Sequence, residues 1–352
     1  MKSARFLTVV FVALLAFGAA AIAAAPQTRT PPAKTPAKSA ARTPAKAATA
    51  PVVALFPVSM GGKTGFVDRG GKLVINPQFD ETGNFSGGFA WFKESRRYGY
   101  VDATGHIAIT PQFEEACDFS EGFACFQLDT WGFVGADGRI AINPQFERAS
   151  GFHEGLAAVR MGGKWGYIDR TGKIAINPQF EEAGEFSAGR ARVNNGGRWG
   201  YVDKAGKLAV NPQFDAAGDF REGLAPVRLG DTWGYIDPAG KYRVSPQFKE
   251  AWAFRETLAR VNVGGKLGFV DATGKLMINP QFDEAGDFHD GLALAVTSGR
   301  GPRGYVDKKG AFAINPQFDE AWDFTNGLAK VKTGAGYGYV DKAGKYVYSP
   351  TK

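Results

Sequence analysis

The chain has 352 residues, with 42 Lys and Arg against 35 Asp and Glu, and a formal net charge of +7 at neutral pH. Seven of the basic residues and none of the acidic ones lie in residues 1–51, so residues 52–352 are electrically neutral. A folded part with a basic surface for nucleic acid is therefore excluded.

Residues 1–25 have the pattern of a secretory signal peptide. Two basic residues precede an apolar run that begins at Phe6, and an Ala-rich stretch follows. Small residues at this point fit the rule for signal cleavage. The sequence therefore predicts a cleaved signal and a periplasmic or secreted protein. The alternative is an inner-membrane anchor facing the periplasm, because about 20 apolar residues can just span a bilayer.

Residues 26–51 consist mainly of Pro, Ala, Thr and Lys, with five basic residues and no acidic one. Such a segment lacks the apolar residues for a core, which predicts a disordered basic linker. Its charge is suited to contact with anionic surfaces such as lipid headgroups or cell-wall polymers. A soluble spacer is the alternative.

Residues 52–352 repeat one pattern of about 34 residues nine times, most clearly from Gly155 to Phe180. A fixed period of this size indicates one supersecondary unit that is stacked on copies of itself. Each copy has a proline at the same place. These prolines are Pro77, Pro111, Pro144, Pro178, Pro212, Pro246, Pro280, Pro316 and Pro350.

The period of apolar residues within a unit is two, as in Lys173 to Asn177, and not the 3.6 of a helix. Gly and Pro also interrupt most units too often for helices. Residues 247–263 contain neither Gly nor Pro and could pass for a helix. They match the other units position by position, with Thr257 in the place of a Gly, so we predict strand there too.

Three short strands are predicted in each unit, for example at residues 224–228, 233–237 and 241–245. The first turn is commonly Gly-Gly, which favours a tight hairpin with positive φ. The second turn is Asp-x-x-Gly, in which the Asp side chain accepts a backbone hydrogen bond. The proline after the third strand is expected to end it, because it cannot donate to a ladder.

The predicted fold is therefore all-β, with nine tandem three-stranded antiparallel β-meander repeats and eight connectors. We expect an open curved solenoid, with a closed β-propeller as the alternative. Nine blades exceed the usual four to eight. The repeat region also begins and ends on whole units, which leaves no strand at one terminus to complete a sheet at the other.

The Trp-Gly-Tyr-Ile-Asp run, the Gly-Lys after its turn, the Pro-x-Phe and the following Phe-x-x-Gly-Leu-Ala resemble the bacterial WG (tryptophan-glycine) β-repeat family. The resemblance covers essentially all of residues 52–352. It implies the repeat fold and no shared catalytic activity. Other residues replace the Trp in five units, which indicates that the position needs bulk more than an indole. The replacements are Thr64, Tyr98, Leu267, Arg303 and Tyr337.

Candidates for catalysis or metal binding are few. His153 and His289 occupy equivalent positions four units apart, so in a linear stack they cannot share a metal or a substrate. The acidic pairs of the connectors lack the Gly-rich spacing of calcium-binding repeats. No nucleophile elbow, phosphate loop or zinc spacing occurs. We therefore predict no catalytic residue, cofactor or metal, and no enzymatic activity.

Cys117 and Cys125 lie within one unit. An oxidising envelope compartment favours a disulfide between them. No other unit has Cys at either position, so the fold does not require the bond, and free thiols are the alternative.

Comparison of the units separates constant packing positions from two variable ones, of which one lies in the first strand and one in the connector. Arg and Trp at such positions are the usual anchors of interfaces. Because packing does not dictate them, we expect replacement of Arg192 and Arg260 to leave the melting temperature nearly unchanged. The candidate partner-binding residues are Trp91, Arg192, Arg260, Lys330, Trp252 and Trp322.

The predicted function is a non-enzymatic binding scaffold of the cell envelope, or a secreted one, with a protein or peptide partner. The alternative is a carbohydrate- or cell-wall-binding module that uses exposed aromatic residues. Inward packing of the second-strand Trp and Tyr would favour the scaffold, and a solvent-facing row of them would favour the glycan module. Strands of five to seven residues are too short for an outer-membrane barrel.

Overall fold

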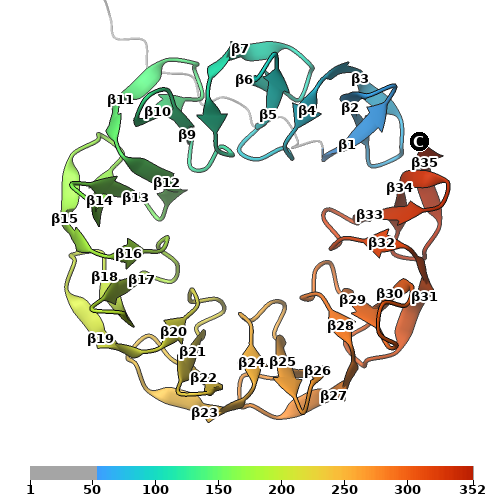
Figure 1. The fold of residues 1–352 in the computed structure, drawn as a ribbon. Coiled ribbons are helices and arrows are strands. Elements are labelled where there is room, and N and C mark those ends of the chain that lie inside the picture. Colours follow the sequence, from blue (N-terminus) through green and yellow to red (C-terminus); the bar gives the residue numbers. More distant parts are fainter. Residues whose placement is uncertain (1–53, 352) are drawn as a thin grey trace, which may run out of the picture. The chain divides into compact units, whose positions relative to one another are not determined.

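The computed structural model describes residues 54–351, which form 35 strands (Figure 1). This part of the chain contains no helix, and therefore none that could cross a membrane. The predicted signal peptide and linker lie outside the described residues.

The strands form nine antiparallel sheets, which we call blades 1 to 9. Blade 1 comprises β1 (Leu55–Met60), β2 (Lys63–Asp68) and β3 (Leu73–Phe79). Blades 2 to 4 comprise β4 (Glu81–Thr82), β5 (Phe89–Glu94), β6 (Arg97–Asp102) and β7 (Ile107–Phe113); β8 (Glu115–Ala116), β9 (Phe123–Gln127), β10 (Trp131–Gly135) and β11 (Ile140–Phe146); and β12 (Arg148–His153), β13 (Leu156–Met161), β14 (Lys164–Asp169) and β15 (Ile174–Phe180).

The remaining blades repeat the same four-stranded order. Blades 5 and 6 comprise β16 (Glu182–Ala183), β17 (Arg190–Asn195), β18 (Arg198–Asp203) and β19 (Leu208–Phe214); and β20 (Ala216–Ala217), β21 (Ala225–Leu229), β22 (Thr232–Ile236) and β23 (Tyr242–Phe248). Blades 7 to 9 comprise β24 (Glu250–Ala251), β25 (Ala259–Val263), β26 (Lys266–Val270) and β27 (Leu276–Phe282); β28 (Glu284–Ala285), β29 (Ala293–Val296), β30 (Arg303–Val306) and β31 (Phe312–Phe318); and β32 (Glu320–Ala321), β33 (Leu328–Thr333), β34 (Gly336–Asp341) and β35 (Tyr346–Thr351).

Three strands of each blade were predicted, and the fourth was missed. It is a short strand in each of the eight connectors, and it pairs with the first predicted strand of its unit. Figure 1 places these short strands, such as β16, β20 and β24, toward the centre of the ring, with the long strands β15, β19 and β23 at its rim. The connectors therefore form the inner wall.

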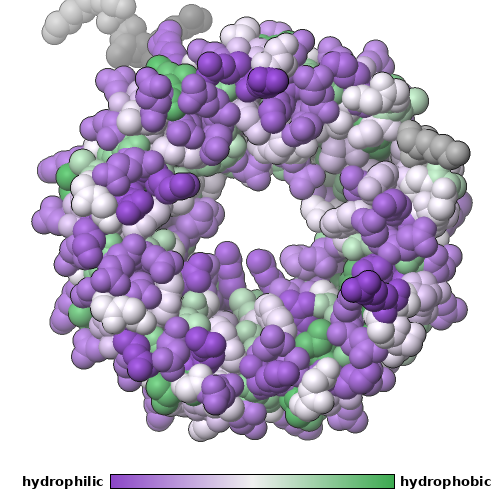
Figure 2. All heavy atoms as spheres, in the orientation of Figure 1, coloured by the Kyte–Doolittle hydropathy of each residue, from purple (hydrophilic) through white to green (hydrophobic). Residues whose placement is uncertain are grey.

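The nine blades close into a ring, so the prediction of an open curved solenoid is wrong and the alternative, a closed β-propeller, is correct (Figure 1). Figure 2 shows that the centre of the ring is open and that the face in view is largely hydrophilic. The apolar residues lie between the blades.

Each blade packs face to face against the next. Between blades 5 and 6, Tyr201 and Phe214 pack against Ala225, Val227 and Ile236, and all five are buried. At six of the blade interfaces, a buried tyrosine hydroxyl also donates a hydrogen bond to a backbone carbonyl of the following blade. Burial raises the pKa of all six tyrosines. They are Tyr100, Tyr167, Tyr201, Tyr235, Tyr305 and Tyr339.

The contact between blades 9 and 1 closes the ring. The ring centroids of Phe56 and Tyr339 lie 5.4 Å apart, and the Tyr339 hydroxyl donates to the Pro57 carbonyl over 2.9 Å. Leu328, Val58 and Val67 complete the buried cluster. Among the described strands, none from one terminus joins the sheet of the other. Closure therefore needs no shared strand, because side chains at this interface pack as they do at the others.

The third strand of each unit continues through its proline, so the prediction that the proline ends it is wrong. In blade 4, Trp165 pairs with Phe180 and Tyr167 with Ile176, so residues 177–179 bulge opposite Gly166. The proline lies in this bulge, where its missing N–H interrupts no regular pairing. A Cβ on Gly166 would lie 2.5 Å from the Ile176 carbonyl oxygen. This contact explains why the aromatic position is followed by glycine.

Both predicted turn types are confirmed. Gly162 and Gly163 have φ of 56° and 77°, as a tight hairpin requires. The Asp169 carboxylate accepts hydrogen bonds from the N–H groups of Thr171 and Lys173, over 2.9 and 3.1 Å. The Thr171 hydroxyl donates to the same oxygen, and these bonds lower the pKa of Asp169.

Residues 247–263 contain strands and no helix, as predicted. Thr257 has a φ of 74°, close to the 83° of Gly223 at the same position of blade 6. A β-branched residue is strained in this region of backbone conformation.

We expect Thr257→Gly to stabilise the protein by about 0.5–1 kcal/mol, since relief of the strain exceeds the greater flexibility of unfolded Gly. The Thr257 N–H donates to Glu222, a bond that Gly retains. Urea unfolding measures the change. Gly223→Thr is the matched reverse substitution and should destabilise; equal midpoints for both variants would contradict the explanation.

Candidate functional site

The two variable positions are neighbours in the same blade, one on the first predicted strand and one, in most blades, directly after the short inner strand. The N–H of Trp252 donates to the Arg260 carbonyl over 3.1 Å, and that of Trp322 donates to the Lys330 carbonyl over 3.0 Å. The same bond recurs in seven of the eight blades that have a connector. The two sets of residues predicted from the sequence are therefore one row of cross-strand pairs, which follows the inner strands around the ring.

In several pairs a large side chain covers a glycine. The Trp91 indole covers Gly83, where a Cβ would overlap the ring, and Arg192 covers Gly184 in the same way. Where both members are large, they stack. The Arg260 guanidinium lies 4.1 Å from the centroid of the Trp252 ring, within the range of a cation–π interaction.

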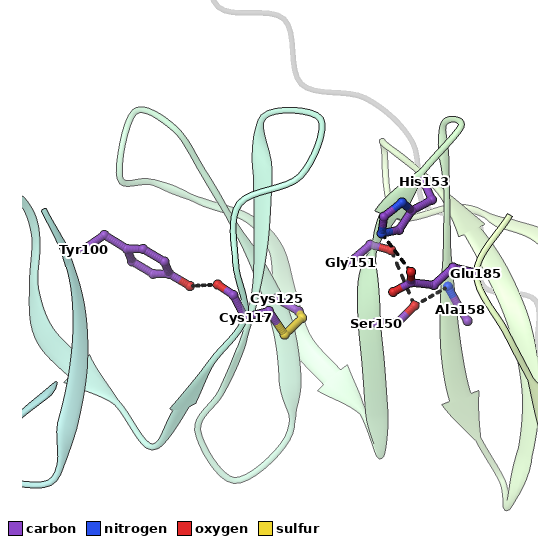
Figure 3. Close-up of a disulfide and its surroundings, with 8 residues drawn as sticks. All are labelled: Tyr100, Cys117, Cys125, Ser150, Gly151, His153, Ala158 and Glu185. Carbon is purple, nitrogen blue, oxygen red and sulfur yellow. Dashed lines mark hydrogen bonds and ion pairs between the residues drawn. A yellow bond between two sulfur atoms is a disulfide. The ribbon is translucent and has the colours of Figure 1, made fainter. Parts of the chain in front are cut away.

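Cys117 and Cys125 are also one of these pairs, and they form a disulfide (Figure 3). Their Cα atoms are 5.2 Å apart, and the Cys117 N–H donates to the Cys125 carbonyl. The bond closes a short loop and stabilises the blade by about 2–3 kcal/mol in chain-entropy terms. Of the two alternatives, the bonded form is the one present.

The two arginines of the row reach across to the following blade. Arg192 Nε lies 3.0 Å from the Asp219 carboxylate, and Arg260 Nη2 lies 3.5 Å from that of Asp287. Arg260 also donates to the Ala285 carbonyl, and only 16% of its side chain is exposed. Burial lowers its pKa. These contacts give both arginines a structural role, so we now expect their removal to lower stability.

We expect Arg260→Ala to destabilise the protein by about 2 kcal/mol, because Asp287 would keep its half-buried charge without a partner. Arg192 is more exposed, at 36%, so Arg192→Ala should cost less. Urea unfolding measures both. The exposed Arg243, which makes no hydrogen bond or ion pair within residues 54–351, is the control. A midpoint for Arg260→Ala equal to that of Arg243→Ala would contradict the structural role.

Five of the six predicted residues line two hollows. Arg192 and Trp252 line a groove of about 760 Å³ over blades 5 to 7. Trp91, Trp322 and Lys330 line a second hollow of about 600 Å³ where blade 9 meets blades 1 and 2. The sequence places Trp91 and Lys330 at opposite ends of the row. Ring closure brings them to the same hollow.

The histidines lie apart. His153 Nε2 is 3.0 Å from a Glu185 oxygen of the next blade (Figure 3), and His289 pairs likewise with Asp323 over 3.7 Å. The third, His106, lies 3.8 Å from Asp102 within its own turn. In residues 54–351, no three His, Cys, Asp or Glu side chains are grouped to hold a metal ion.

The aromatic residues of the second strand are mostly turned inward. Tyr167 and Tyr201 are buried, and Trp165 and Trp199 are half-buried against core clusters. Trp322, with 41% exposure, belongs to the connector instead. No solvent-facing row of second-strand aromatics is therefore found among the described blades.

The groove over blades 5 to 7 is also lined by Arg228 and Trp233, which the variation between units does not indicate. They are paired on β21 and β22. The available signal was Ala216, which stands opposite Arg228 where most connectors have Glu.

A family model described as WG containing repeat matches most of the chain. The matched residues are 65–95, 98–129, 131–165, 165–199, 199–233, 233–266, 268–300 and 304–335. No curated protein matches the sequence.

Similar solved structures include the crystal structure of a eukaryotic initiation factor, with a TM-score of 0.60 and 10% identity over 84% of this chain and 95% of that one. At this identity the likeness shows the fold alone. The dihydro-heme d1 dehydrogenase NirN has a TM-score of 0.45 and 12% identity, over 86% of this chain and 74% of that one. A streptogramin B lyase has a TM-score of 0.37 and 14% identity, over 60% and 88%.

Proposed function

This chain belongs to the WG-containing repeat family, and from that premise we propose that it is a non-enzymatic scaffold that binds a protein or peptide partner. The proposal rests chiefly on the coincidence of the variable row with the two hollows. The blade frame is constant, whereas the paired residues on it differ from blade to blade. Repeat scaffolds present binding surfaces in this way.

The aromatic side chains favour a protein or peptide over a glycan. Glycan modules need a row of aromatic rings open to solvent, and most second-strand rings, such as Tyr167 and Trp165, pack inward instead. The hollow at the ring closure supports cell-wall glycan as a second candidate ligand, because Trp91 and the exposed Trp322 both line it. This candidate is confined to that hollow.

The proposed location is the periplasm or the cell exterior, after removal of the signal peptide; an inner-membrane anchor facing the periplasm is the alternative. The disulfide supports either, because such bonds persist in oxidising compartments. The non-enzymatic assignment is supported by the separation of the histidines along the ring. The basic linker would supply contacts to anionic surfaces.

The protein purified from the envelope, with its native N-terminus, can be used to capture partners from envelope extract, beside a peptidoglycan sedimentation assay. Captured proteins are retested in purified form against Trp252→Ala and against a Trp91→Ala, Trp322→Ala double variant. Loss of a purified partner in either variant would support the scaffold. Sedimentation that depends on Trp91 and Trp322 would support the glycan candidate, and binding that neither variant weakens would contradict the assignment of the site.

A further inference from the structure

Arg228 differs from three other first-strand arginines that have a buried Nε atom. The Nε atoms of Arg160, Arg192, Arg228 and Arg260 are all shielded from solvent without a hydrogen-bond partner. Three of them have a carboxylate within 4.0 Å, namely Glu147, Asp219 and Asp287. Arg228 has no carboxylate at this distance within residues 54–351. It is therefore a half-buried cation without a counterion in the described part of the chain.

Comparison of the blades shows what Arg228 lacks. Two residues after the variable position of the first strand, a polar side chain usually faces a Glu on the inner strand. In blade 9, Lys332 Nζ lies 2.6 Å from Glu320, and in blade 7, the Asn262 amide donates to Glu250 over 2.8 Å. The residue opposite Arg228 is Ala216. The Glu carboxylate that faces the corresponding residue in most other blades is therefore absent opposite Arg228.

The groove over blades 5 to 7 gives access to this cation. Trp233 is the cross-strand partner of Arg228 on β22, and Trp252 on blade 7 and Pro226 line the same groove. The two indoles give the groove apolar surface. The volume, about 760 Å³, suits a short extended segment.

The other charged groups of the groove restrict what it accepts. Arg192 is paired with Asp219, and Glu250 accepts a bond from Asn262. Lys249 adds a positive charge, and Asp231 adds a negative one. The acids disfavour a dianion such as phosphate. The guanidinium fork suits a single carboxylate.

We propose that this groove binds an acidic peptide segment of a partner protein, with one Asp or Glu carboxylate on Arg228. The bound carboxylate takes the place that Glu occupies in the neighbouring blades, and Trp233 and Trp252 contact the apolar residues beside it. The inference rests on the proposed scaffold function and names the class of its ligand.

The test uses the mature protein and a fluorescent peptide, acetyl-Ala-Leu-Glu-Leu-Glu-Ala-amide, with its Gln counterpart, in anisotropy titrations at low salt. The Glu peptide is expected to bind at least about tenfold more tightly than the Gln peptide, as is typical for loss of a charge-assisted hydrogen bond. Arg228→Gln and Ala216→Glu should each weaken binding by about tenfold or more. Ala216→Glu acts by restoring the internal partner, so its melting temperature should not fall.

Arg243→Gln, on the exposed rim strand β23, is the matched charge control and should bind as the unmodified protein does. Equal binding of the Glu and Gln peptides, binding unaffected by Ala216→Glu, or no binding of the Glu peptide at about 1 mM would each overturn the acidic-peptide assignment. Retention of a captured partner by Arg228→Gln would overturn this inference while leaving the scaffold intact. Absence of any partner that depends on the row would contradict the scaffold itself.

Discussion

Replacement of Gly200 by Ala is expected to destabilise the propeller by about 3 kcal/mol or more. Gly200 lies on β18 opposite the bulge of β19, and a Cβ there would lie 2.5 Å from the Val210 carbonyl oxygen and 2.6 Å from Pro212 N. Both are backbone atoms, so a side-chain rotation cannot remove the overlap. The two strands must separate locally, which exposes the buried side chains of the blade.

Urea unfolding followed by circular dichroism measures the loss. Gly334→Ala is the control, because a Cβ at that exposed position meets nothing within 4 Å. It should leave the midpoint nearly unchanged. If Gly200→Ala were as stable as Gly334→Ala, close backbone approach would not be the reason for glycine after the aromatic position.

Phe56→Ala is expected to destabilise the protein by about 3–5 kcal/mol and to open the ring. Phe56 is 5% exposed and packs on Tyr339 across the closing interface. The corresponding position is Ala in each of the other eight units, for example Ala191 and Ala225. The closing interface is therefore the only one of the nine that is filled by a large side chain at this position of the first strand. Its removal leaves a cavity between the first and last blades, where no chain connection holds the two sheets together.

Phe214→Ala is the matched control, because this residue fills the interface between blades 5 and 6. It should cost similar stability, but the chain itself joins those blades. Small-angle scattering below the unfolding midpoint should therefore show a larger radius of gyration for Phe56→Ala than for Phe214→Ala. Equal radii would mean that the closing interface is no weaker than an internal one.

The candidate site could be predicted only in part. Variation between units identified six residues, and five of them line the two hollows. It did not show that they form cross-strand pairs, because the connector strand has only two residues in most blades and too few positions to show an alternation. Arg228 was missed because its distinguishing feature is the absence of a partner at Ala216, which becomes visible only when the register of β20 and β21 is known.

The sequence by itself determined the all-β class, the nine units, three strands of each unit and both turn types. These depend on interactions between residues close in the chain: alternation along a strand, positive φ in a two-residue turn, and the Asp side chain bonded to nearby N–H groups. The turn position of Thr257 was predicted correctly for the same reason, because the residues on either side of it align with those of the other units.

Only the tertiary structure decided ring closure, the inner strands and the contents of the two hollows. Closure depends on the rotation from one blade to the next, which follows from how large side chains such as Tyr201 and Phe214 pack between sheets. The rotation between blades cannot be predicted from the residue pattern of a single unit. Two distant residues, Trp91 and Lys330, therefore share a hollow because of the sum of nine such rotations.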